Sequence, residues 1–179
     1  MEHPSSGFKQ TKRLALCAIL AGLSLAVLYL GSLSGIFDLC AVVVGALCTA
    51  FVVLEIGGVY PWLTGAVTGV LAVLLLPDKF VALEYIVLGG LYPILKSFLE
   101  RFGRVFSWIL KLIYFNCALT ICVLLAMFVL HLQDFVSASW ILIYGAGNVF
   151  FVVYDIALTS FISVYVLRLR KRLKIRGLK

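Results

Sequence analysis

The sequence predicts an all-α integral membrane protein with six transmembrane helices and both termini in the cytoplasm. Its 179 residues are 64% hydrophobic and only 13% charged, whereas soluble globular chains are about half apolar and about a quarter charged. A mean hydropathy of +1.15 agrees with a membrane class. Since a spanning helix needs about 20 apolar residues, the chain has room for about six spans and for no separate soluble catalytic domain.

Short polar or glycine-rich stretches separate the apolar runs and predict the domain organisation. We expect a flexible cytoplasmic leader over residues 1–11, a six-helix transmembrane domain over residues 12–167 and a basic cytoplasmic tail over residues 168–179. The Pro-Asp-Lys turn at residues 77–79 is so short that the helices on either side should be antiparallel neighbours. The six helices should cover about residues 12–30, 39–56, 61–76, 80–101, 106–130 and 140–167, with residues 31–38 as the first loop.

The positions of the basic residues predict the orientation of the chain. If the N-terminus is cytoplasmic, every Lys and Arg except Lys79 falls on the inner side, and an excess of these residues marks the cytoplasmic side of a membrane protein. Lys96 and Lys111 then lie toward the inner ends of their helices. The basic tail favours contact with anionic lipid. Nucleic acid is not favoured, because no basic surface interleaved with aromatic residues accompanies the tail.

The fourth predicted helix carries features that a simple anchor does not need. Its outer half holds Glu84, and Gly89, Gly90 and Pro93 follow toward its middle. An acid inside a spanning helix costs a few kcal/mol, and Gly and Pro open backbone groups that neighbouring groups must satisfy. We therefore expect the outer half of this helix to line a site, with the glycines and the proline serving close packing and a bend.

Polar residues within the last three helices predict where a small molecule would bind. At about 1.5 Å per residue they fall in the outer part of the fourth and sixth helices and near mid-membrane on the fifth and sixth. Ionisable residues inside a membrane usually face a bundle interior or an aqueous cavity. We expect a polar cavity among these helices, open to the outside. Its candidate substrate-binding residues are Glu84, Tyr85, Asn116, Tyr144, Asn148 and Asp155.

Glu84, Asp155 and Asn148 also have purely structural interpretations. Glu84 could reach the outer interface, where Lys79 would screen its charge. Asp155 could be a structural partner of Asn116 or of a tyrosine hydroxyl, and Asn148 could form an interhelical hydrogen bond. Glu55, at the end of the second helix, is expected to be an interfacial carboxylate.

Signatures of enzymes and metal sites are missing from the sequence. It contains no H-E-x-x-H, no G-x-S-x-G and no glycine-rich phosphate loop. The two histidines fall outside the deep parts of the spans, so general-base chemistry by imidazole is not expected. The five cysteines lack metal-ligand spacing and should be packing residues. We expect neither an enzyme nor a bound cofactor or metal.

Small residues form a stripe on the first predicted helix. Ala18, Gly22 and Ala26 recur every four residues and therefore share one face. Small residues let another helix approach closely in a membrane. The stripe either packs inside this chain or docks on a separate membrane subunit.

This layout resembles the substrate-binding S components of energy-coupling factor (ECF) transporters. The resemblance lies in six helices within 179 residues, cytoplasmic termini, a basic leader running into LALCAILAGLSLAV, and polar residues on the last three helices. It implies that a vitamin or other micronutrient binds near the outer side. It also implies that Ala18, Gly22 and Ala26 dock on a transmembrane T component, that separate ATPase subunits hydrolyse ATP, and that the protein lies in the bacterial plasma membrane.

The sequence departs from that family at the first helix, and two other classes stay open. The family's motif is usually an alanine pair four residues apart, whereas the best matches here are Ala18 with Gly22 and Cys17 with Ala21. No binding motif for riboflavin, thiamin, biotin or folate is recognised, so the substrate is open. A membrane scaffold similar to the rod-shape-determining MreD proteins would need no outward cavity. In a stand-alone small carrier or channel, Asp155 would be a proton or cation site.

Overall fold

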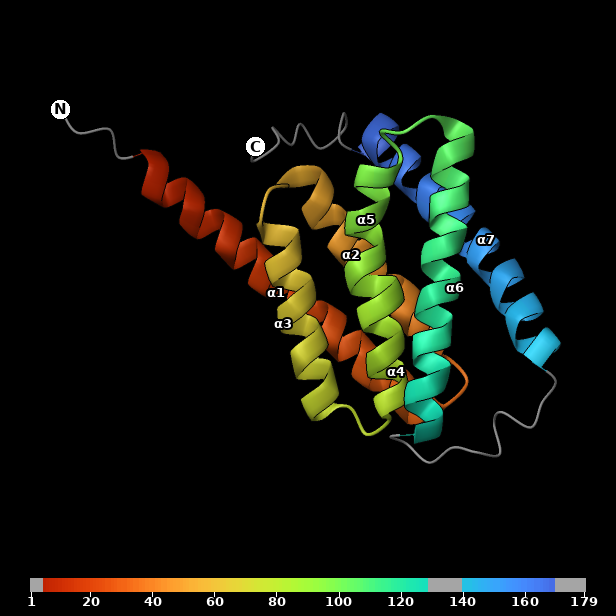
Figure 1. Cartoon of the computed structure of the whole chain (residues 1–179). Helices are drawn as coiled ribbons and strands as arrows, with labels where there is room; N and C mark the ends of the chain where they lie inside the picture. Colours follow the sequence, from red (N-terminus) through yellow and green to blue (C-terminus); the bar gives the residue numbers. More distant parts are fainter. Residues whose placement is uncertain (1–4, 129–139, 170–179) are drawn as a thin grey trace. The chain divides into compact units, whose positions relative to one another are not determined.

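The computed structural model describes residues 5–128 and 140–169, and within them it consists of helices joined by short turns, without a strand. The all-helical class is thus confirmed for the described part of the chain (Figure 1). In chain order the elements are α1 (Ser5–Ser34), α2 (Asp38–Glu55), α3 (Tyr60–Leu75), α4 (Lys79–Glu84), the π-helix η1 (Tyr85–Leu91), α5 (Tyr92–Leu99), α6 (Arg104–Phe128), α7 (Trp140–Val164) and the π-helix η3 (Tyr165–Leu169).

Five of the described helical stretches are long and apolar enough to cross a membrane, which is compatible with a multi-pass membrane protein. One of them, Lys79–Leu99, runs through α4, η1 and α5 without a break. The helix α3 is also apolar but has only 16 residues, or about 24 Å at 1.5 Å per residue. The hydrocarbon core of a bilayer is about 30 Å thick. The predicted third span is therefore shorter than the other five.

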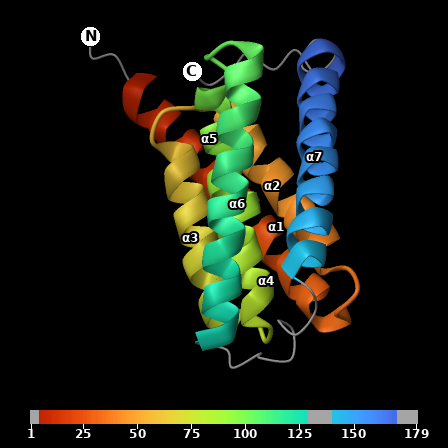
Figure 2. The ribbon, with the colours of Figure 1, turned by 45° about the vertical axis from the view of Figure 1, so that its right-hand side comes forward.

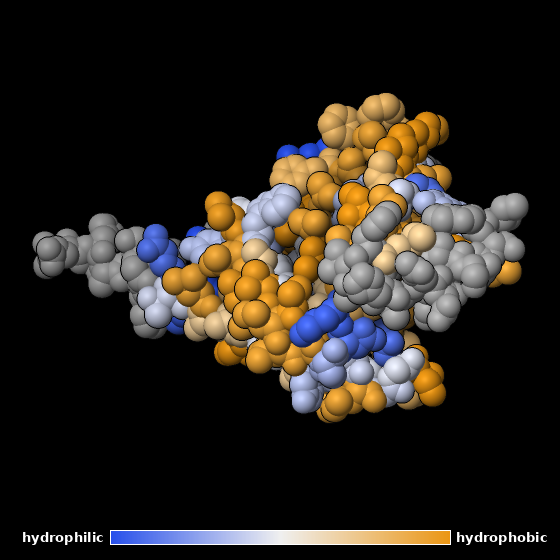
Figure 3. Space-filling view, turned by 60° about the horizontal axis from the view of Figure 1, so that its bottom comes forward, coloured by the Kyte–Doolittle hydropathy of each residue, from blue (hydrophilic) through white to orange (hydrophobic). Residues whose placement is uncertain are grey.

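The surfaces of these helices carry many large apolar side chains. Exposed leucines, isoleucines and valines occur on α1, α2, α3, α6 and α7. Figure 3 shows one such face, on which hydrophobic residues cover most of the described surface. A soluble monomer rarely exposes so much contiguous apolar surface, whereas helices in contact with lipid need no polar cover.

The chain divides into two compact units, which are described separately below. The first runs through α1, α2, α3, α4 and η1 and includes α5 as far as Ser97. The second begins at Phe98 and holds α6, α7 and η3. Figure 2 shows the same elements from a second direction.

The first helix is longer at both ends than the sequence predicts. It begins at Ser5, so the predicted start at about Lys12 is wrong, and residues 1–4 lie outside the described residues. Residues 9–13 are Lys, Gln, Thr, Lys and Arg, of which all but Thr are good helix formers, so the helix continues through this polar stretch. Of the predicted basic tail, residues 170–179 also lie outside the described residues.

The predicted loop over residues 31–38 shrinks to a turn at residues 35–37, because α1 continues to Ser34. The Ser34 hydroxyl donates to the carbonyl oxygen of Gly31 at 2.7 Å, which lets this serine end the helix. Gly35 then adopts φ +63°, a conformation that glycine reaches without steric cost. The chain reverses there and enters α2.

Close approach of glycines positions α3 against the central part of the Lys79–Leu99 stretch. A Cβ on Gly65 would lie 3.4 Å from the Cα and carbonyl oxygen of Gly90, and one on Gly69 would lie 3.0 Å from Ile86 Cγ1. The G-x-x-x-G pattern of α3 is therefore used within the first unit. It supports the predicted pairing of the third and fourth helices, which lie side by side (Figure 1).

The predicted bend in the fourth helix takes the form of the π-helical turn η1. The amide of Tyr92 donates to the carbonyl of Val87, five residues earlier. Pro93 follows directly and has no N–H to donate, so the carbonyls of the preceding turn need other donors, and a π turn is one adjustment that supplies them. Gly89 lies inside this turn and leaves room for the ring of Tyr85.

Candidate functional site

The six predicted substrate-binding residues divide between the two units. Glu84 and Tyr85 belong to the first unit, and Asn116, Tyr144, Asn148 and Asp155 belong to the second. A polar cavity among the fourth, fifth and sixth predicted helices would involve both units and stays a prediction. The contacts of each group within its own unit are described here.

In the second unit, Asp155 on α7 forms an ion pair with Lys111 on α6. The Lys111 ammonium lies 3.3 Å from Oδ1 and 3.1 Å from Oδ2 of Asp155, and the two side chains are only 5% and 3% exposed. The same nitrogen donates to Glu100 Oε1 at 3.0 Å, and that carboxylate is 45% exposed. The ring of Trp108 adds a cation–π contact at 5.5 Å from its centroid. The buried charges thus neutralise each other inside the unit.

Asn116 on α6 and Asn148 on α7 form a reciprocal amide pair. Asn116 Nδ2 donates to Asn148 Oδ1 at 3.0 Å, and Asn148 Nδ2 donates to Asn116 Oδ1 at 3.1 Å. The second hydrogen of each amide goes to the carbonyl one turn earlier in its own helix, Leu112 at 2.9 Å and Tyr144 at 2.8 Å. The interhelical hydrogen bond predicted for Asn148 is confirmed, and Asn116 is its partner.

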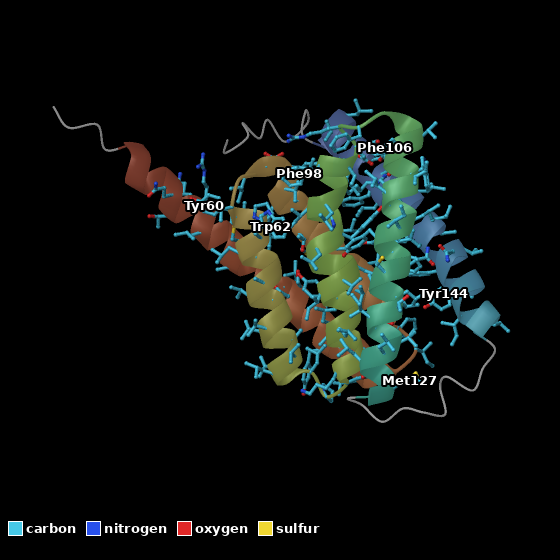
Figure 4. The ribbon with its side chains drawn as sticks, in the orientation of Figure 1. Tyr60, Trp62, Phe98, Phe106, Met127 and Tyr144 are labelled. Atoms are coloured by element: carbon cyan, nitrogen blue, oxygen red, sulfur yellow. The ribbon has the colours of Figure 1, made fainter. Side chains whose placement is uncertain are left out.

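Nearer the end of α6 and the start of α7, the hydroxyl oxygens of Thr120 and Tyr144 lie 2.8 Å apart. Figure 4 labels Tyr144 on α7. The rings of Phe115 and Phe151 stack with centroids 4.4 Å apart. We call the three polar contacts Lys111–Asp155, Asn116–Asn148 and Thr120–Tyr144 the polar ladder.

The sequence alone did not predict Lys111 as a member of this site. It placed Lys111 only at the inner end of its helix and named Asn116 or a tyrosine hydroxyl as the structural partner of Asp155. The structure gives Asp155 a charged partner, Lys111. A partial signal was present in the sequence, because in an antiparallel helix pair residues earlier on one helix face residues later on the other. Lys111 lies five residues before Asn116, and Asp155 lies seven residues after Asn148.

In the first unit, Glu84 carries a buried carboxylate oxygen, Oε2, with no hydrogen-bond partner among the described residues. Oδ1 of Asp38, at the start of α2, is also buried without a hydrogen-bond partner among the described residues. The negative charges of Asp38 and Asp78 lie close enough to Glu84 to repel a negative charge on its carboxyl group. The ammonium of Lys79 donates to the carbonyls of Val73 and Leu76 at 2.8 Å each. Lys79 is thus engaged at the end of α3.

Tyr85 is a core residue of the first unit. It is fully buried, its ring lies against Gly45 and Gly89, and its hydroxyl oxygen lies 3.3 Å from Thr49 Oγ1. The two glycines leave the space that the ring fills. The direct contacts of Tyr85 thus account for its burial by packing between α2 and η1.

Two charged residues of the first unit are buried, although the sequence predicts that both lie near the membrane boundary. Glu55 and Lys96 are each 1% exposed, so the prediction of Glu55 as an interfacial carboxylate is wrong. Distance from a helix end was the only guide that the sequence offered. It gives depth along the helix but not the face, and the face of α2 that carries Glu55 points into the unit.

The helix α1 has two different faces. Cys17, Ala21 and Leu28 are buried in the unit, whereas Ala18, Gly22 and Ala26 are all exposed. A Cβ on Gly22 would meet nothing within 4 Å. Beside the exposed stripe lies an apolar groove of about 270 Å³, lined by Leu14, Cys17, Ala18, Ala21, Leu63, Thr64 and Val67.

Two further grooves of the first unit are also apolar. One, of about 270 Å³, lies along α3 and η1 and includes Trp62, which Figure 4 labels near the start of α3. The other, of about 340 Å³, lies beside the turn between α1 and α2. None of the three grooves is lined by a predicted substrate-binding residue.

No family model, no curated protein and no solved structure matches this chain. Among the described residues, no group of three or more His, Cys, Asp and Glu side chains could hold a metal ion. The geometry offers three features for a functional argument. They are the exposed stripe of α1, the unpartnered carboxylate oxygens at Glu84 and Asp38, and the polar ladder.

Proposed function

We propose that this protein is the substrate-binding membrane subunit of an ECF-type transporter that takes up a vitamin or another micronutrient. The observation that carries the proposal is the exposure of Ala18, Gly22 and Ala26 on α1. In a bilayer, helices associate through such small-residue faces because the backbones can approach closely. The first unit packs the opposite face of α1 and leaves this one for another subunit, in this proposal the T component.

In the proposed arrangement the chain crosses the bacterial plasma membrane six times with both termini inside. The shorter α3 is the third span, which a bilayer accommodates by local thinning at modest cost. Substrate enters from the outer side, reached through the turn that holds Asp78. Glu84 is the first proposed contact, because its unpartnered oxygen is an acceptor for an N–H or ammonium group of a ligand.

Energy for uptake comes from ATPase subunits that act through the T component. The substrate-binding subunit captures its ligand outside and reorients against the T component to release it inside. A contact made of Ala18, Gly22 and Ala26 suits such a movement, because these three residues have no side chain long enough to interlock with the partner. Contacts of the substrate with Tyr85, Asn116, Tyr144, Asn148 and Asp155 remain predictions.

Replacing Gly22 by leucine tests the proposed docking face. A branched side chain at this exposed position should keep the T component away from α1 without disturbing the fold, because no atom lies within 4 Å of the added Cβ. We expect Gly22→Leu to lose most of the T component and ATPases that copurify with the tagged wild-type protein. The matched control is Gly145→Leu on α7, where a Cβ likewise meets nothing within 4 Å. Equal copurification of partners with both variants would contradict the proposal.

A membrane scaffold is the second candidate, favoured by one specific observation. The three grooves described above are apolar, and the four candidate residues of the second unit hydrogen-bond across its two helices. A scaffold needs no polar cavity. It would tolerate Glu84→Gln with no loss of function, whereas the transporter subunit would not.

A further inference from the structure

The three contacts of the polar ladder all fit one antiparallel register of α6 against α7. Going along α6 from 111 to 116 to 120, the partners on α7 run backwards from 155 to 148 to 144. The stacked pair Phe115–Phe151 follows the same order. Four contacts of different chemistry therefore agree on a single antiparallel alignment.

A shift of one helical turn would break every rung. Moving α7 by about four residues would bring Phe151 or Thr159 opposite Lys111 in place of Asp155. The Asp155 carboxylate would then lie in an apolar surrounding without its lysine, which is a costly state inside a membrane, and Lys111 would keep the half-exposed Glu100. The amide pair would be lost by the same shift.

In the observed register, the Asn116–Asn148 pair leaves no side-chain N–H without an acceptor. Both hydrogens of each side-chain amide are donated, one across the pair and one to the helix's own backbone. The ion pair is nearly inaccessible to solvent. These are the properties of a device that selects one alignment, as a single buried polar residue does in a coiled coil.

We infer that the polar ladder fixes the register of α6 against α7. The Lys111–Asp155 ion pair is the contact of the ladder that this register requires. Lys111 and Asp155 are positioning residues in this account. The inference is independent of the proposed function, because a transporter subunit and a scaffold would both need a defined hairpin.

Disulfide cross-linking in the full chain tests the register directly. All five native cysteines are replaced by alanine, and Leu119→Cys is combined with Gly147→Cys, since a Cβ at Gly147 would lie 3.2 Å from Leu119 Cδ2. A second pair, Leu119→Cys with Ile143→Cys, reports a shift by one turn. With the ladder intact, we expect the first pair to cross-link and the second to cross-link weakly.

Removing one charge should loosen the register, and removing or exchanging both should restore it. Lys111→Leu should lower the yield of the in-register cross-link by about tenfold or more, because it leaves the buried Asp155 carboxylate without its counter-charge. Asp155→Leu should lower the yield less, because Lys111 keeps Glu100. The double variant with both leucines and the exchange of Lys111→Asp with Asp155→Lys should recover the yield. Glu100→Gln is the control, because its carboxylate is half-exposed and Lys111 keeps Asp155.

Two results would overturn the inference. One is a wild-type cross-linking pattern in both single variants. The other is a double variant and an exchanged variant that do no better than the single ones. Should the single variants fail to accumulate in the membrane, accumulation itself becomes the readout, and the double and exchanged variants must then recover where the single ones do not.

Discussion

Glu84 is the residue at which the structure and the proposed function meet most closely. Its Oε2 atom is buried without a hydrogen-bond partner among the described residues, and Asp38 and Asp78 add negative charge nearby. Burying an unpartnered acceptor costs about 1–3 kcal/mol. A ligand that donates an N–H or carries a positive charge would recover this cost, so Glu84 is the best candidate for substrate contact in the first unit.

Glu84→Gln is expected to weaken ligand retention while the fold persists. A hydrogen bond to a charged group contributes about 1.5–3 kcal/mol, so the dissociation constant should rise by about tenfold or more. The measurement is the fraction of gently purified protein that carries a small molecule in native mass spectrometry. Glu100→Gln, in the second unit, serves as the control and should retain wild-type occupancy. Equal occupancy in Glu84→Gln and wild type would favour the scaffold.

At the scale of single residues, the sequence predicted which residues make specific polar contacts better than it predicted which residues are buried. It singled out Asn116, Asn148 and Asp155, and the structure shows all three in specific polar contacts. It could not show that Glu55 and Lys96 are buried, because burial depends on which face of a helix meets its neighbour. That face is set by packing of side chains that are far apart in sequence.

At the scale of helices, α2 and η1 approach each other through the pair Gly45 and Tyr85. Gly45→Ala should destabilise the protein, because the new Cβ would lie 2.8 Å from Tyr85 Cε2 and the fully buried ring lies against Gly89 as well. Overpacking of this kind costs about 1–3 kcal/mol. Thermal unfolding in a mild detergent measures the change. Gly145→Ala, where nothing lies within 4 Å, should be neutral or slightly stabilising, and similar losses in the two variants would contradict this account of α2.

Helix positions followed from apolar runs, but helix details did not. The ends of α2 and α3 lie within about two residues of the predicted ones. The extension of α1 depends on polar residues that are good helix formers, and hydropathy alone does not recognise them. The π turn in the Lys79–Leu99 stretch arises from Pro93 together with packing at Gly89 and Gly90, and the sequence indicated only a bend.

At the scale of the whole molecule, the distribution of charge predicts which side of the membrane each turn occupies. In the background without native cysteines, Pro77→Cys should react with a membrane-impermeant maleimide added outside intact cells. Gly103→Cys should react only after the cells are permeabilised, since the positive-inside rule places this turn in the cytoplasm. Both positions are exposed in the structure. Labelling in the opposite pattern would show that the predicted orientation is wrong.

The central claim is that this chain works as one subunit of a larger transporter and carries a small molecule. Native mass spectrometry of the tagged wild-type protein, gently purified from a bacterial host that expresses ECF modules, tests both parts in a single measurement. We expect masses for the chain with a retained small molecule and for its complex with a T component and ATPases. A clean monomer with neither ligand nor subunit attached would contradict the claim.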